Sequence, residues 1–74
     1  MPATRYAVTV YYLTGGFTSE TCTRTNLTAT LWKAEKETRR AVAFAVVKSL
    51  HADRVVAVAK KMATGFSVSA YVDA

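Results

Sequence analysis

The chain has 74 residues, of which 51% are hydrophobic and 20% are charged. A chain of this length buries only a small core, so we expect one domain over residues 1–74 and little room for a deep catalytic cavity. Ten Lys and Arg residues against five Asp and Glu residues give a net charge of +5. This balance favours anionic partners, such as nucleic acid, nucleoprotein or an acidic protein surface.

The first element predicted is a strand over residues 5–14, where aromatic and β-branched residues alternate. Gly15 and Gly16 follow at once, and two glycines between strand-like runs predict a tight hairpin because its central positions need a positive φ. A second strand then returns from Phe17 through a threonine-rich stretch. Where it ends is left open between Asn26 and Trp32.

Good helix formers begin at Lys33, and we predict a single helix over residues 33–51. Two further strands are expected over residues 54–61 and 66–72, joined by the turn 62–65. The predicted order is therefore ββαββ. The fold class is α+β, an antiparallel four-stranded sheet with one helix packed on one face.

Residues for catalysis or metal binding are few, since the chain has one histidine, His51, and one cysteine, Cys22. A nucleophile needs a base beside it, and these two lie in distant predicted elements. A structural zinc site needs three or four nitrogen or sulfur ligands. We therefore expect no enzyme activity, no catalytic residue, no metal and no cofactor.

The lone Cys22 cannot form an internal disulfide, which fits a reducing compartment. The longest apolar run, 41–47, is far shorter than the roughly 20 residues of a membrane-spanning helix. The tyrosine-rich start of the chain reads as a strand and not as a signal peptide. These features predict a cytoplasmic protein with no membrane partner.

The predicted helix carries more apolar surface than one sheet can cover, because residues 41–47 are apolar nearly all round. Either Phe44 and Val47 join the core, or they form an apolar spot inside a basic rim, as at protein interfaces. The second case would serve a foreign partner or a homodimer that pairs through the helices. The candidate partner-binding residues are Lys33, Lys36, Arg40, Phe44, Val47 and Lys48.

The open face of the predicted sheet is the alternative site, this time for nucleic acid. Tyrosines beside lysines and threonines can stack on bases and meet phosphates. The candidate residues on this face are Tyr11, Lys60, Lys61 and Tyr71. A solvated sheet face is the plain alternative, since the chain has no DNA- or RNA-binding signature.

The short basic chain, the hairpin 6–24, the alanine-rich helix expected over 39–50 and the terminal hairpin 54–72 together resemble small phage-encoded anti-defence proteins. Among these are anti-CRISPR inhibitors of type I surveillance complexes. The resemblance implies a stoichiometric inhibitor in the host cytoplasm that docks on a host protein or nucleoprotein complex, with no cofactor. Our hypotheses are thus a non-enzymatic binding protein of this inhibitor type, a small basic DNA- or RNA-binding protein, and a self-assembling homo-oligomer.

Overall fold

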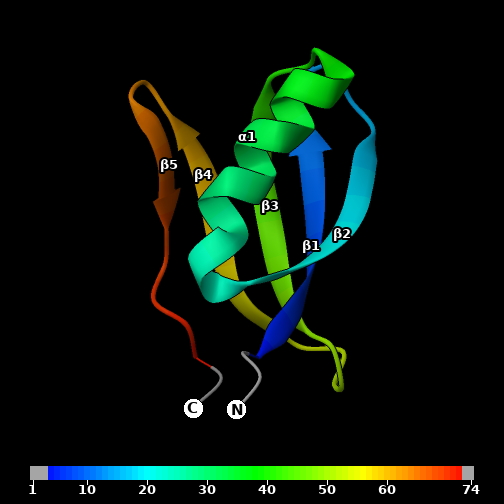
Figure 1. Cartoon of the computed structure of the whole chain (residues 1–74), viewed down its shortest axis with the longest axis vertical. Coiled ribbons are helices and arrows are strands. Elements are labelled where there is room, and N and C mark those ends of the chain that lie inside the picture. The colour runs from blue at the N-terminus through cyan, green and yellow to red at the C-terminus, as the bar shows by residue number, and fades with distance from the viewer. Residues whose placement is uncertain (1–3, 73–74) are drawn as a thin grey trace.

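The computed structural model describes residues 4–72, which form one antiparallel sheet with one α-helix across it (Figure 1). The sheet has five strands in the order β2-β1-β3-β4-β5. The prediction of a four-stranded ββαββ sheet is therefore wrong in its strand number, whereas the α+β class is confirmed. In chain order the elements are β1 (Arg5–Tyr12), β2 (Phe17–Thr23), a 3₁₀ turn (Arg24–Asn26), α1 (Leu27–Thr38), β3 (Val42–Ser49), β4 (Val55–Met62) and β5 (Gly65–Val68).

The first hairpin is confirmed, because β1 and β2 pair antiparallel in unbroken register from Arg5↔Thr23 to Tyr11↔Phe17. Gly15 and Gly16 have φ values of 95° and 82°, which residues with a side chain rarely adopt. The connection spans residues 13–16, so it is longer than the predicted two-residue turn.

The helix lies earlier than the predicted span of 33–51. It begins at Leu27, directly after the 3₁₀ turn, although threonines in its first turns are weak helix formers. Leu27, Leu31 and Ala34 follow the helical repeat and are all buried against the sheet. Burial of this stripe outweighs the local preference of the threonines for extended backbone.

The helix ends at Arg39, whose backbone is left-handed, with φ 56° and ψ 32°. Its N–H donates to the Glu35 carbonyl at 2.8 Å, as in a helix C-terminal motif that more often uses glycine. Residues 42–49, predicted as the second half of the helix, are instead strand β3. This strand pairs with both β1 and β4 and lies between them in the sheet.

The core lies between α1 and the sheet, and strand residues supply it, in strict alternation along β1 and with register shifts in the pairing of β3. In β1, Tyr6, Val8, Val10 and Tyr12 are buried; in β3, Val42, Ala45 and Val47; in β4, Val56, Ala57 and Ala59. Cys22 of β2 joins them opposite Tyr6. Figure 1 shows the helix in front of the central strands, so within residues 4–72 the opposite side of the sheet, here called the open face, has no second layer.

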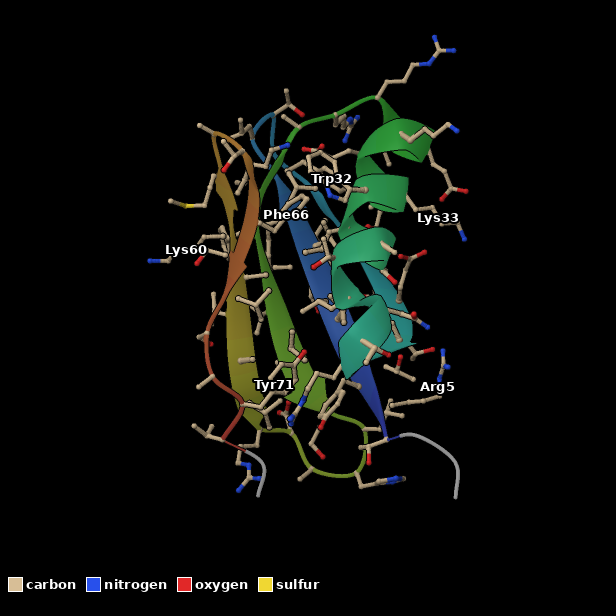
Figure 2. The ribbon with its side chains drawn as sticks, turned by 60° about the vertical axis from the view of Figure 1, so that its left-hand side comes forward. Arg5, Trp32, Lys33, Lys60, Phe66 and Tyr71 are labelled. Carbon is tan, nitrogen blue, oxygen red and sulfur yellow. The ribbon has the colours of Figure 1, made fainter. Side chains whose placement is uncertain are left out.

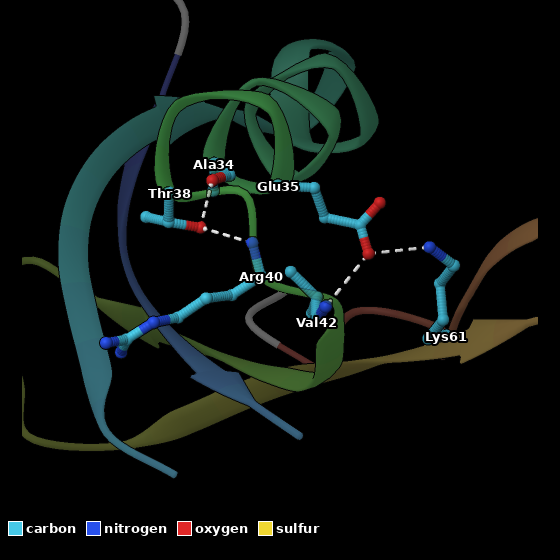
Figure 3. A network of polar contacts seen from close by, with 6 residues as sticks. All are labelled: Ala34, Glu35, Thr38, Arg40, Val42 and Lys61. Atoms are coloured by element: carbon cyan, nitrogen blue, oxygen red, sulfur yellow. Dashed lines mark hydrogen bonds and ion pairs between the residues drawn. The ribbon is translucent and has the colours of Figure 1, made fainter. Parts of the chain in front are cut away.

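A polar network fastens the end of α1 to the sheet (Figure 3). The Glu35 carboxylate accepts a hydrogen bond from the Val42 N–H at 2.8 Å and one from Lys61 Nζ at 2.6 Å. Nearby, the Thr38 hydroxyl donates to the Ala34 carbonyl. Glu35 thus joins the helix to the first residue of β3 and to the far end of β4.

The last predicted strand, 66–72, is regular only through Val68. Beyond it the chain still follows β4, since the N–H groups of Ser69 and Val72 donate to the carbonyls of Val58 and Val56. The Val58 N–H, however, donates to the Ser69 hydroxyl instead of a backbone carbonyl. The irregular ladder ends the strict alternation of side chains before Tyr71.

Candidate functional site

The residues of the predicted helical interface do not come together. Val47 is fully buried under α1, whereas Phe44 and Lys48 project from the open face, because a strand places alternate residues on opposite sides. Lys33 and Lys36 remain on the helix, on the other side of the molecule. The prediction of helices paired through residues 41–47 is wrong, since this segment lies within the sheet.

The sixth residue of that set, Arg40, follows the helix and lies against the first hairpin. Its guanidinium lies beside Gly16: a Cβ atom built on this glycine would be 3.5 Å from Arg40 Nη1. Its backbone N–H donates to the Thr38 hydroxyl (Figure 3). Arg40 is therefore a charge at the end of the sheet and not part of a helical face.

The four residues of the predicted nucleic-acid face divide between the two sides of the sheet. Tyr11 and Lys60 lie on the open face, as predicted, and Figure 2 shows Lys60 pointing away from the helix. Lys61 lies on the helix side, where it bonds Glu35. Tyr71 also packs on the core side, with its ring centroid 5.2 Å from that of Tyr6.

Three aromatic side chains form a line across the open face, which we call the aromatic row: Phe17, Tyr11 and Phe44. They come from three adjacent strands and are direct cross-strand partners. The Tyr11 and Phe44 rings are stacked, with centroids 4.7 Å apart and an angle of 18° between planes. The Phe17 ring lies 5.9 Å from that of Tyr11. Phe17 is 64% exposed and Phe44 is 40% exposed.

The same register leads from the aromatic row to a cation, because Lys60 of β4 is the partner of Phe44. Lys60 is exposed, and within residues 4–72 it makes no ion pair. A second lysine, Lys48, is bridged to Asp53 at 3.3 Å. Arg5 is the first residue of β1, at the opposite end of that strand from Tyr11, and its guanidinium donates to the Thr21 carbonyl and hydroxyl.

None of the described carboxylates belongs to a strand residue of the open face, and the one that reaches an open-face lysine is Asp53, which pairs with Lys48. Glu35 and Glu37 belong to α1, and Glu20 is the cross-strand partner of buried Val8, so it points to the helix side. Asp53 lies in the β3–β4 connection, at the opposite end of β3 from the aromatic row. Across the described strands the open face therefore combines aromatic rings, hydroxyls and cations without a carboxylate of its own.

A second aromatic cluster lies on the helix side, where Trp32 of α1 meets Phe66 of β5 (Figure 2). The two rings contact edge to face with centroids 4.8 Å apart. Lys61 Nζ lies 4.6 Å from the Trp32 ring and is also held by Glu35. These contacts join the helix to the last strand. Lys61 therefore has a structural role in holding α1 against the sheet.

Two titratable groups on the helix side, Glu35 and Cys22, have pKa values shifted by their surroundings. Burial raises the pKa of the Glu35 carboxyl, but hydrogen bonds from Lys61 and Val42 outweigh burial, and the net pKa lies below its ordinary value. Burial also raises the pKa of the Cys22 thiol, which Thr30 and the charge of Arg5 offset only in part. Cys22 is thus a protonated core residue. Among residues 4–72, no three His, Cys, Asp or Glu side chains are grouped to hold a metal ion.

Phe17 is the member of the row that sequence reasoning missed, whereas Phe44 was predicted at a helical interface and not on the open face of the sheet. The alternation of Val42, Phe44 and Val46 with alanines and Val47 was a strand signal, but it also fits a buried helix. For Phe17 the signal was its position directly after the glycine turn, where a hairpin brings it opposite Tyr11. A period-two reading of residues 42–49 would have indicated a strand that contains Phe44.

Comparison with protein-family models, with curated proteins and with solved structures finds no match to this chain. The resemblance to phage-encoded inhibitors is not tested by these comparisons and stays a prediction. Among residues 4–72, no helix is long and apolar enough to cross a membrane.

Proposed function

We propose that this chain is a non-enzymatic nucleic-acid-binding protein that uses the open face of its sheet. The observation that carries the proposal is the aromatic row, which runs in register into Lys60 on a face whose described strands present no carboxylate. Aromatic rings offer surfaces for bases, and cations attract phosphates. The net charge of +5 adds a long-range attraction for any polyanion.

A face-to-face homodimer fits this surface less well. Two copies would bring the Lys60 side chains of both open faces together, and across the described strands neither face presents a carboxylate of its own to oppose them, since Lys48 is already paired with Asp53. Burial of charge without a partner is costly, whereas phosphate supplies the missing negative charge. The function is proposed for the cytoplasm, in keeping with the lone buried thiol of Cys22.

Binding of fluorescent oligonucleotides over a range of salt concentrations tests the proposal. Affinity should fall steeply with salt, because each phosphate contact releases counterions. Lys60→Gln should weaken binding and lower the slope of log affinity against log salt by about one. The matched control is Lys33→Gln, which removes the same charge from the helix side, where Figure 2 shows Lys33 pointing away from the sheet.

The two lysine variants carry the same net charge, so any difference between them reports position. Equal losses for both variants would mean that binding follows net charge and not the open face. A folded wild-type protein that binds no oligonucleotide at low salt would overturn the proposal. The inhibitor of a host protein or nucleoprotein complex would then be the hypothesis to pursue, by capture from lysate with and without nuclease.

A further inference from the structure

We infer that the ligand of the open face is a single strand, whose unpaired bases continue the stack of the aromatic row. This inference rests on the proposed nucleic-acid function and adds the class of nucleic acid. It follows from three features of the described structure: how the three rings are arranged, which hydroxyls lie beside them, and where the helix is.

The arrangement of the rings leaves stacking positions at both ends of the row. Tyr11 occupies the middle, with Phe44 stacked on one side of it and Phe17 tilted by 42° on the other. The two outer rings are the more exposed ones, at 40% and 64%. An unpaired base can therefore stack on Phe44 and leave its phosphate beside Lys60, the next residue in register.

Hydroxyl groups lie in the next line across the same face. Thr9 of β1 and Ser19 of β2 are cross-strand partners, two residues along from Tyr11 and Phe17. Residues two apart in a strand project from the same side, so these hydroxyls lie beside the rings. A hydroxyl can donate to or accept from the edge of an unpaired base, which a duplex would have used in pairing.

The position of the helix argues against a duplex ligand. Proteins read duplexes by placing a helix or a two-stranded ribbon in a groove, and bases inside a duplex already stack on one another. Here α1 covers the other side of the sheet (Figure 1). The aromatic row and Lys60 together cross four strands, roughly 14 Å at a strand spacing of about 4.8 Å. The aromatic row therefore presents ring surface to a nucleic-acid strand that runs across the β-strands of the sheet.

Three probes of equal length separate bases from phosphates: a thymidine homopolymer of about twelve nucleotides, an abasic oligonucleotide, and a duplex. Fluorescence anisotropy at low salt should show the thymidine strand bound at least about tenfold more tightly than either other probe. A uridine homopolymer in parallel compares RNA with DNA. Tighter binding of either single strand than of its duplex supports the inference. The homopolymer that binds more tightly shows whether DNA or RNA is preferred.

Variants of the row test whether the rings supply this preference. Phe44→Leu and Tyr11→Leu should each weaken binding of the thymidine strand by about 5- to 100-fold and leave the abasic probe unchanged. Phe17→Ala is the second variant should the others fail to fold, since Phe17 is the most exposed ring of the row. Leu50→Ala, an exposed apolar residue in the β3–β4 connection, is the matched control.

The outcomes distinguish this inference from the function on which it rests. Equal binding of duplex and single strand, with no effect of the row variants, would overturn the inference and leave nucleic-acid binding in place. A folded protein that binds none of the probes would overturn both. Loss of thymidine binding in Leu50→Ala equal to that in Phe44→Leu would also overturn the inference, since it would show that the rings have no special part.

Discussion

The Glu35 carboxylate should make a measurable contribution to stability, because it connects the helix to two strands that are distant in sequence. Glu35→Gln removes its charge while keeping its size and one acceptor oxygen. A hydrogen bond to a buried charged group contributes about 1.5–3 kcal/mol. The Glu35 and Lys61 side chains are 15% and 28% exposed, so solvent screening reduces this value. We expect Glu35→Gln to lower the free energy of unfolding by about 1–2 kcal/mol at neutral pH.

The effect should depend on pH in a direction set by the lowered pKa of Glu35. A carboxyl whose pKa is lower in the folded state binds its proton more weakly there than in the unfolded chain. Its stabilising contribution is therefore complete above the ordinary glutamate pKa and is lost as pH falls through the folded value. The difference in unfolding free energy between wild type and Glu35→Gln should shrink toward zero over that acidic window.

Urea unfolding followed by circular dichroism at a series of pH values measures this difference directly. Glu37→Gln is the matched control, since Glu37 is an exposed residue of the same helix with no ion pair among residues 4–72. Its stability should stay within about 0.5 kcal/mol of wild type. A loss at Glu35 that is the same at neutral and acidic pH would refute the reasoning, because it would show that charge has no part in the contact.

Further predictions concern the core and the helix end. Leu31→Ala should destabilise by about 2–5 kcal/mol, since Leu31 is fully buried; a loss below 1 kcal/mol in urea unfolding would contradict the position of α1. Arg39→Gly should raise the free energy of unfolding by up to about 1 kcal/mol, because glycine adopts the left-handed conformation without steric cost, and a lower urea midpoint would count against it. Cys22 should react with alkylating reagents at neutral pH far more slowly in the native than in the urea-unfolded protein, since its thiol is buried with a raised pKa; equal rates would show that it is accessible.

The first hairpin could be predicted from the sequence alone. Its information is local: period-two alternation in β1, two glycines suited to positive φ, and a β-branched return strand. Because hairpin pairing joins neighbours along the chain, no distant contact is needed to specify it. The same holds for the turn between β4 and β5, where the observed strands lie within a residue or two of the predicted limits except at the irregular end.

The middle of the chain could not be assigned from local pattern. Residues 41–47 alternate alanine with larger apolar residues, a sequence compatible with a buried helix or a central strand. Pairing decided between them, since β3 has β1 on one side and β4 on the other and satisfies its backbone groups with both. The threonine-rich start of α1 was decided in the same way, by burial of Leu27 and Leu31 against that sheet.

The candidate site also depends partly on local pattern and partly on tertiary pairing. The sequence analysis placed Tyr11 and Lys60 on the open face, where the structure also has them, but it placed Lys61 and Tyr71 there as well, and both lie on the helix side. The third ring of the row, Phe44, joined them only through the tertiary structure, which set β3 beside β1 and Tyr11 opposite Phe44. Local pattern determines which side of a strand a residue takes, whereas cross-strand neighbours distant in sequence depend on the order and register of the whole sheet.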